Sequence, residues 1–240
     1  MKRFWKQVAI DADRVVTLDG RPVRTPGRVP LALPTDALAA AVAAEWDAVP
    51  DTIDPRAMPL TGLANAAIDR IASDPASFAA GLAAYGSSDL LYYRAESPEP
   101  LIDRQIAAWD PWLDWARTRY DVHFETTAGI MHCAQPAATL ARLSDAVSAL
   151  DAFRLAGLSQ VVTITGSLVL ALVLIERAGD PNTLWAAANV DEDWQAELWG
   201  QDTLAAQALA NKHREFDAAD RKSTRLNSSH SRASRMPSSA

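Results

Sequence analysis

RVVTLDGRPVRTP, residues 14–26, decides the fold class, because it holds two short runs of strand-forming residues around an Asp-Gly pair. Asp19-Gly20 between two such runs is a strong signal for a β-hairpin, since the tight turns that join antiparallel strands need positive φ angles. FWKQVAI, residues 4–10, supplies a third run of the same kind. Residues 1–33 therefore predict a small antiparallel sheet.

Helical patterns follow the sheet. Thr35 stands directly before DALAAAVAAEWDA, where its hydroxyl is suited to cap the first turn. Within that segment Leu38, Val42 and Trp46 recur at helical spacing and form an apolar stripe. Further stretches of helical character continue to about residue 221. Because strands come first and helices after them, the sequence predicts the α+β fold class.

Three segments leave the details of these helices open. Pro111 either divides SPEPLIDRQIAAWDPWLDWARTRY into two helices or marks a kink in one. VHFETT and IMHC, on either side of Gly129, are expected to form a hairpin or an extended pair. A helix that opens at Pro181 is expected to continue past Leu198.

The segment from Leu155 to Ile175 carries no charged residue and is long enough to be compared with a membrane span. Serine, threonine, glutamine and glycine crowd its first half, and only SLVLALVLI is strongly apolar. This distribution favours a buried central helix over insertion into a bilayer.

Composition and charge limit the classes of partner and the compartment. A formal net charge of −7 argues against a nucleic-acid partner, since phosphates require a basic surface. The single cysteine, Cys133, excludes an internal disulfide and fits a reducing compartment. The start, MKRFWKQVAI, lacks the apolar core and cleavage site of a secretory signal, so we expect a cytoplasmic protein.

The character of the sequence changes at Lys222. The segment KSTRLNSSHSRASRMPSSA is rich in serine, contains basic but no acidic residues, and shows no apolar periodicity. It has too little apolar surface to offset the entropy of ordering. Residues 222–240 are therefore expected to be a disordered tail or a segment foreign to the gene.

The sequence shows no catalytic or metal-binding motif. The histidines and the cysteine of the body do not follow the spacings of metal sites. No GxSxG elbow and no glycine-rich phosphate loop is present. We therefore expect no catalytic residue and no metal site, and a protein that acts by binding.

The densest acidic cluster lies in NVDEDWQAELWG, in a chain with eight tryptophans. Asp191 belongs to this cluster, and Glu192, Gln195 and Trp199 follow one helical stripe. The structural interpretation is a solvated helix face beside a stripe of core residues. The functional interpretation is an acidic-aromatic edge that recognises a partner, because tryptophan is common at the energetic centres of interfaces.

Several motifs, in this order, resemble one known family: FWKQVAI, VTLDGRPVRTP, AAEWDA, IDPRAMPLTGLANAAID, SSDLLYYRAE, RQIAAWDPWLDWA and DEDWQAELWGQD. They are similar to those of the assembly chaperones of the F-type ATP synthase that hold the alpha subunit of its catalytic head. The match runs from about Arg3 to about Arg221. Gly62 departs from it, since a longer side chain is more usual after MPLT, and the tail has no counterpart.

The resemblance implies a two-domain protein without enzymatic activity or cofactor. We place a small N-terminal α/β domain at residues 1–70 and an all-helical C-terminal domain at residues 71–221. The implied client is the free alpha subunit, which the chaperone keeps from aggregating until the beta subunit replaces it. The implied binding residues are Glu192, as the first choice, with Gln195, Trp199 and Asp191. Trp46 is also sensitive in the family, but its helical position suggests a role in folding.

Two competing functions remain open at this point, a small-molecule enzyme and a structural or adaptor protein of another complex. Tyr92, Tyr93 and Arg94, together with nearby carboxylates, could line the pocket of a small-molecule enzyme. A deep pocket with strongly shifted pKa values would favour that enzyme, and a shallow apolar patch with an acidic rim would favour a binding protein.

Overall fold

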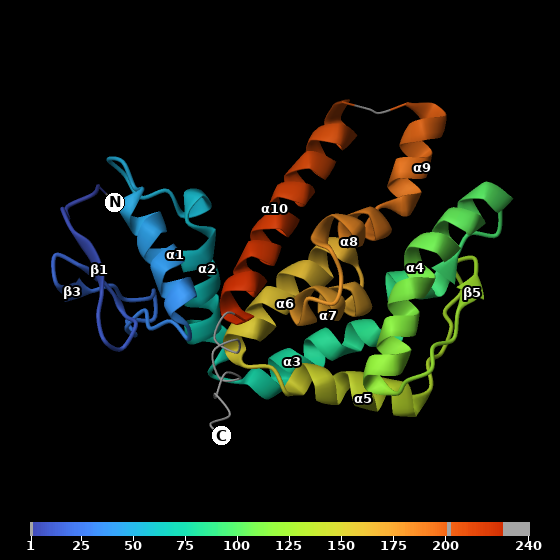
Figure 1. The fold of residues 1–240 in the computed structure, drawn as a ribbon, viewed down its shortest axis with the longest axis horizontal. Coiled ribbons are helices and arrows are strands. Elements are labelled where there is room, and N and C mark those ends of the chain that lie inside the picture. Colours follow the sequence, from blue (N-terminus) through green and yellow to red (C-terminus); the bar gives the residue numbers. More distant parts are fainter. Residues whose placement is uncertain (1, 201–202, 228–240) are drawn as a thin grey trace, which may run out of the picture. The chain divides into compact units, whose positions relative to one another are not determined.

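The computed structural model describes residues 2–200 and 203–227 of the chain (Figure 1). It divides into two compact units. The N-terminal unit is built mainly from residues 2–74 together with residues 152–156, and the C-terminal unit from residues 75–151 and 157–220.

The N-terminal unit contains an antiparallel sheet in the order β1-β2-β3, formed by Val8–Ile10, Val16–Leu18 and Arg21–Pro22. Leu18 pairs with Arg21 across the Asp19-Gly20 turn, and both turn residues have positive φ angles. The Asp19 carboxylate accepts hydrogen bonds from the backbone N–H groups of Lys6 and Gln7. The predicted hairpin is therefore confirmed, and its turn also holds the residues directly before β1.

The helical segments of the same unit are α1 (Asp36–Asp47), the 3₁₀ turn η1 (Pro55–Ala57), α2 (Pro59–Ala66) and the π-helical turn η2 (Ala67–Ile71). Helix α1 packs against β1 and β2 of the sheet, and α2 packs against α1. The predicted cap is confirmed, because the Thr35 hydroxyl accepts a hydrogen bond from the backbone N–H of Leu38. Trp46 is 9% exposed and lies 5.4 Å from Trp5 between ring centroids. Trp46 is thus part of the folded core.

Two carboxylates join segments that the sequence separates. Glu45 in α1 accepts hydrogen bonds from the backbone N–H groups of Leu60 and Thr61 at 2.7 and 2.8 Å, which caps the start of α2. Asp69 accepts the hydroxyl of Thr25 at 2.6 Å and the backbone N–H of Gly27 at 2.8 Å. Helix N-termini and tight loops leave unpaired donors, so these carboxylates stabilise the packing of the unit.

The C-terminal unit is mostly helical. Its elements are α3 (Pro75–Ala83), η3 (Ala84–Ser87), η4 (Leu90–Tyr92), β4 (Tyr93–Arg94), α4 (Glu99–Tyr120), β5 (Thr127–Ala128), α5 (Ala137–Ser148), most of α6 (Ala152–Thr165), α7 (Leu168–Glu176), α8 (Pro181–Ala188), α9 (Val190–Trp199) and most of α10 (Thr203–Asn227). The α+β fold class is therefore confirmed. The unit adds one feature to the expected helices, a two-residue parallel pair of β4 with β5. The expected pairing of VHFETT with IMHC around Gly129 is wrong, because Thr127 at the end of VHFETT pairs with Tyr93 of β4.

The apolar segment 155–175 is largely buried, as expected, but it forms two helices instead of one. Gly166 has a φ of 69°, which ends α6, and the Ser167 hydroxyl accepts the backbone N–H of Leu170 at 3.0 Å, which starts α7. Every residue of α7 up to Ile175 is buried, and α7 contacts α4, α8 and η3. Asp89, which is fully buried, accepts the backbone N–H of Val169 at 3.0 Å and so caps the same helix.

The structure also answers two other questions, whether a helix continues through Pro111 and whether the helix that opens at Pro181 continues past Leu198. Helix α4 continues through Pro111, because Gln105, Trp109, Leu113 and Ala116 form one buried stripe across the missing hydrogen bond. The helix that opens at Pro181 does not continue past Leu198 as expected. It ends at Ala188, because Asn189 leaves the helical conformation and its side chain donates to the carbonyl of Trp185 at 2.8 Å.

Within the described ranges, no helix combines the length and apolar character needed to cross a membrane. Helix α10 continues through Asn227, past the expected start of the tail at Lys222. The remainder of that tail, residues 228–240, lies outside the described residues.

Candidate partner-binding site

Helix α9 carries all four residues expected to bind a partner. It begins at Val190, directly after the break at Asn189, so its direction differs from that of α8. The continuous helix expected from Pro181 past Leu198 is therefore divided in two. Leu184 is fully buried, whereas Leu198 is 55% exposed. The exposed end of α9 is consequently a surface and not an extension of the core.

Asp191 holds α9 against α4. The buried side chain of Gln105 donates from Nε2 to Asp191 Oδ1 at 2.7 Å, and its Oε1 accepts the backbone N–H of Ala95 at 2.7 Å. A single amide thus joins α9, α4 and the segment after β4. Asp191 points toward this junction and is not among the residues that line the pocket beside α9.

A second link between α9 and α4 lies further along α9, at Glu197. Arg104 forms two hydrogen bonds with the Glu197 carboxylate, at 2.8 and 2.7 Å, and its guanidinium lies 4.8 Å from the ring centroid of Trp194. The hydrogen bond from Arg104 lowers the pKa of Glu197 below its ordinary value. Partial burial raises the pKa of Asp193 in the same helix. The pKa values of Asp193 and Glu197, two carboxylates of the same helix, are therefore shifted in opposite directions.

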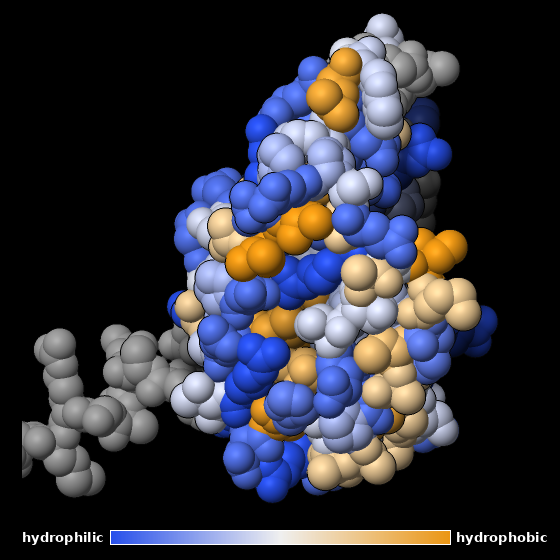
Figure 2. Space-filling model, turned by 90° about the vertical axis from the view of Figure 1, so that its right-hand side faces the viewer, coloured by the Kyte–Doolittle hydropathy of each residue, from blue (hydrophilic) through white to orange (hydrophobic). Residues whose placement is uncertain are grey.

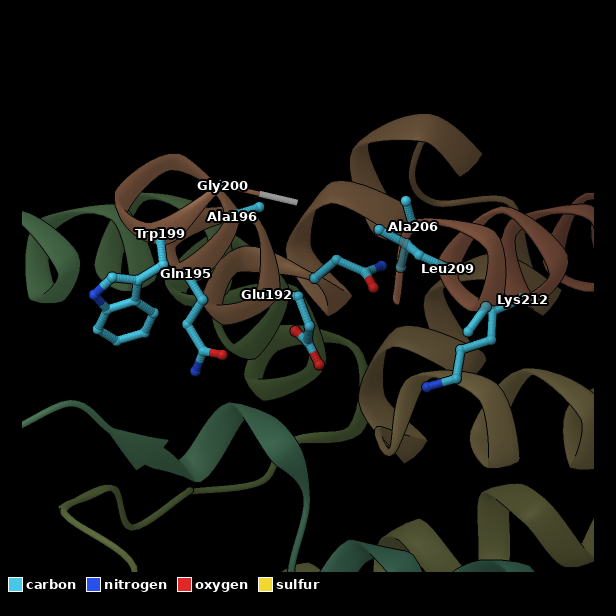
Figure 3. A pocket seen from close by; sticks show the side chains of 10 residues that line it. Glu192, Gln195, Ala196, Trp199, Gly200, Ala206, Leu209 and Lys212 are labelled. Atoms are coloured by element: carbon cyan, nitrogen blue, oxygen red, sulfur yellow. The ribbon is translucent and has the colours of Figure 1, made fainter. Parts of the chain in front are cut away.

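Glu192, Gln195 and Trp199 project together from another side of α9 (Figure 3). The Trp199 side chain is 78% exposed, and Gly200, with a φ of 80°, ends the helix directly after it. The Glu192 side chain makes no hydrogen bond or ion pair with any residue that the structure describes. This side of the helix is therefore available for a partner.

These three residues form one wall of a pocket of about 370 Å³ between α9 and α10. Figure 3 shows the second wall, from which Ala206, Leu209 and Lys212 face α9. The complete lining consists of Asn189, Glu192, Gln195, Ala196, Trp199, Gly200, Ala206, Ala208, Leu209 and Lys212. We call this pocket the α9–α10 groove. Small and apolar side chains line much of it, and Glu192 and Lys212 place opposite charges on its two walls.

Aromatic contacts attach α10 to α8. The His213 ring stacks on Trp185 with 4.6 Å between centroids and 21° between planes, and Phe216 lies 5.4 Å from the same tryptophan. Phe216 is 1% exposed. The position of the second wall thus depends on aromatic packing within about one helical turn of Lys212.

Comparison with known proteins identifies the family of this chain. The profile of the ATP12 chaperone protein family matches residues 2–117. The crystal structure of Atp12 from Paracoccus denitrificans has 41% sequence identity and a TM-score of 0.89, and the match covers 94% of this chain and 98% of that one. The chain belongs to the ATP12 chaperone family. It is thus a member of the family of ATP synthase assembly chaperones that its motifs resemble.

Two further comparisons agree with this membership. A mutant of P. denitrificans Atp12p has 42% identity and a TM-score of 0.90, over 94% of this chain and 97% of that one. The mitochondrial protein atp12 of Schizosaccharomyces pombe is 24% identical over 214 residues, which are 83% of this chain and 74% of that protein. The family is one of chaperones, so this chain is an assembly chaperone and not an enzyme.

The side chains considered for an enzyme pocket are engaged elsewhere in this ATP12-family chain. Tyr92 is fully buried and donates its hydroxyl to the carbonyl of Gly86. Arg94 donates to Asp110 at 2.6 Å and lies 5.0 Å from the ring centroid of Trp109. In the described parts of the chain, His, Cys, Asp and Glu form no group of three that could hold a metal ion. Tyr92 and Arg94 therefore stabilise the fold of the C-terminal unit.

The sequence predicted that the residues of one wall of the α9–α10 groove share a helix face, and it did not predict the other wall. Glu192, Gln195 and Trp199 meet as expected from their helical spacing, and Asp191 faces another side. Leu209 and Lys212 were not predicted, although α10 has a helical pattern, because no sequence signal pairs it with α9.

The apolar residues on the surface in Figure 2, which views the side where Figure 1 has α4, β5 and α9, were also not predicted. Among the side chains of the C-terminal unit whose burial the structure describes, the large exposed apolar ones are Tyr85, Ile106, Ile130, Met131, Leu198 and Trp199.

Proposed function

We propose that this chain binds the unassembled alpha subunit of the F-type ATP synthase catalytic head and prevents its aggregation until the beta subunit replaces it. We assign the contact to the side of α9 that carries Glu192, Gln195 and Trp199. The observation that carries this assignment is the 78% exposure of Trp199 beside the α9–α10 groove. The identity of the client comes from the resemblance of the motifs.

The physical argument for Trp199 rests on surface energetics. A large exposed aromatic ring leaves apolar area in water, and burial of that area against a partner releases about 25 cal/mol per Å². Tryptophan is enriched among the interface residues whose loss costs about 2 kcal/mol or more. An anchor of this kind suits a chaperone, because the client surface that needs protection before assembly is itself apolar.

Glu192 supports the same assignment through charge. Asp191 and Glu197 on the same helix are already hydrogen-bonded, to Gln105 and Arg104. Glu192 lines the groove with no partner in the described structure, so its charge remains available to a basic group of the client. The formal net charge of −7 would also steer the chain toward a basic patch. In this proposal Asp191 positions α9 and does not touch the client.

Exchange with the beta subunit requires a complex of moderate affinity. A small contact built around one anchor and one charge pair fits this need, because dissociation rates fall steeply as affinity rises. Asp191, Glu197 and their partners hold α9 in place before the client arrives. The ordering cost of binding is therefore small.

Coexpression with an isolated alpha subunit tests this proposal. The wild-type chain is expected to keep alpha soluble and to copurify with it, whereas Glu192→Lys is expected to lose both properties while circular dichroism stays unchanged. Asp145→Lys, at an exposed acidic residue of α5, is the matched control and is expected to behave as wild type. If alpha remains insoluble with the wild-type chain, the proposed client is wrong. If Glu192→Lys protects alpha normally, the site is wrong.

A further inference from the structure

We propose that the α9–α10 groove receives a single helix of the client, which presents an apolar face to the groove, a basic side chain to Glu192 and an acidic side chain to Lys212. This inference rests on the proposed function and deepens it, because it names the secondary structure and the charge pattern of the segment that binds. It also assigns half of the contact to α10.

The shape of the groove supports a closely packed element. Ala196 on α9 and Ala206 and Ala208 on α10 line it, and Gly200 stands at one end. Small side chains let another backbone approach closely. Leu209 adds an apolar side chain to the α10 wall, and Trp199 stands at the end of the α9 wall (Figure 3).

The chemistry of the walls favours a helix over an extended segment. The lining residues belong to α9, to α10 and to the residues that begin and end α9. The backbone groups within these helices are already hydrogen-bonded to their own helix, so the groove offers no strand edge along its length. An extended chain placed there would leave its own N–H and C=O groups without partners. A helix satisfies its backbone internally and binds such a groove through its apolar face.

The charges of the two walls specify how that helix is oriented about its axis. Glu192 and Lys212 lie on opposite walls (Figure 3), and neither side chain forms a hydrogen bond or an ion pair with another described residue. A bound helix with a basic residue on one edge of its apolar face and an acidic residue on the other would pair with both. The reverse arrangement would place like charges opposite each other, which disfavours it.

Position-specific photocrosslinking tests the inference. A benzophenone side chain at Ala208, exposed on α10, is expected to crosslink to the alpha subunit in the copurified complex. The matched position is Ala141, exposed on α5, which is expected to give no crosslink. Peptide mapping of the Ala208 crosslink is expected to identify an amphipathic helical segment of alpha. A crosslink to an extended segment, a crosslink to a second copy of this chain, or no crosslink from Ala208 would each overturn the inference.

Filling the groove supplies a second test, which separates this inference from the proposed function. Ala206→Trp is expected to weaken binding of alpha by ~10-fold or more, and Ala141→Trp to leave it unchanged. Lys212→Glu is expected to weaken binding as well, since it opposes the acidic residue of the bound helix. If Glu192→Lys abolishes binding while Ala206→Trp and Lys212→Glu bind normally, α9 binds alpha without the groove and this inference fails. If the wild-type chain itself fails to bind alpha, the proposed function fails.

Discussion

The side chain of Gln105 donates to Asp191 at 2.7 Å and accepts the backbone N–H of Ala95 at 2.7 Å, so one buried amide joins α4 to α9. This link sets the position of the wall that carries Glu192, Gln195 and Trp199. The Asp191 carboxylate and the Gln105 amide are therefore expected to affect client binding without touching the client.

Gln105→Leu tests this positioning role. The substitution leaves the Asp191 carboxylate and the Ala95 N–H without their partner, so the free energy of unfolding is expected to fall by about 1–3 kcal/mol. The affinity for alpha is expected to fall as well, although Gln105 is 1% exposed. Urea unfolding and a binding titration measure the two effects. Ile106→Leu, at the exposed neighbouring position, is the control and is expected to change neither quantity by much.

Glu45→Ala is expected to destabilise the N-terminal unit. The change removes the acceptor of the Leu60 and Thr61 N–H groups at the start of α2, and the loss of a helix cap of this kind costs about 1–2 kcal/mol. Glu45→Gln keeps one acceptor oxygen and is expected to lose less. The control is Asp47→Ala, because the exposed Asp47 side chain lies 3.7 Å from Arg3, a pair that contributes little. Equal loss in the Glu45 and Asp47 alanine variants, in urea unfolding, would show that the cap has no special role.

Two glycine substitutions are expected to have opposite effects. A Cβ at Gly27 would lie 2.6 Å from Asp69 Oδ1, so Gly27→Ala is expected to destabilise the chain by about 1–3 kcal/mol. A Cβ at Gly62, within α2, would meet no atom within 4 Å. Gly62→Ala is expected to stabilise the chain by about 0.5–1 kcal/mol, since alanine has the higher helix propensity. Thermal unfolding of the pair measures both effects, and a neutral Gly27→Ala would show that the loop moves away from Asp69.

The buried Asp89 is expected to make stability depend on pH. Burial raises the pKa of Asp89 from 3.8 to about 6, so the folded chain binds this proton more tightly than the unfolded chain. The stabilisation is therefore fully present below about pH 4, is lost as the pH rises to about 6, and changes little above that. The loss is on the order of 3 kcal/mol.

Asp89→Asn removes this titration while it keeps one acceptor oxygen. The difference in unfolding free energy between wild type and variant is expected to favour wild type most at about pH 4 and to shrink toward pH 7. Urea unfolding at low protein concentration is suited to this comparison, since the sequence pI is about 5.1. A difference that stays constant over this range would show that Asp89 titrates as it does in the unfolded chain.

The features predicted correctly from the sequence depend on neighbouring residues. The hairpin at Asp19-Gly20 and the cap at Thr35 are local, because each is fixed by contacts within a few positions. The same holds for the joint projection of Glu192, Gln195 and Trp199, which follows from helical spacing alone.

The features that were missed depend on distant partners. Gly166 and Asn189 end helices that a local pattern continues. Ser167 and the distant Asp89 cap α7, and these caps stabilise the chain only once α7 is buried. The pairing of β4 with β5 and the approach of α10 to α9 join segments far apart in the chain. Helical periodicity has no signal for either. The boundaries between the expected domains, at residues 1–70 and 71–221, stay a prediction.

Light scattering of a purified alpha subunit, diluted from denaturant with one equivalent of the chain, tests the central claim most directly. The wild-type chain and Asp145→Lys are expected to suppress the aggregation of alpha, whereas Glu192→Lys and Trp199→Ala are expected to suppress it weakly or not at all while they remain folded. Full suppression by the folded Glu192→Lys and Trp199→Ala variants would contradict the claim that this side of α9 holds the client.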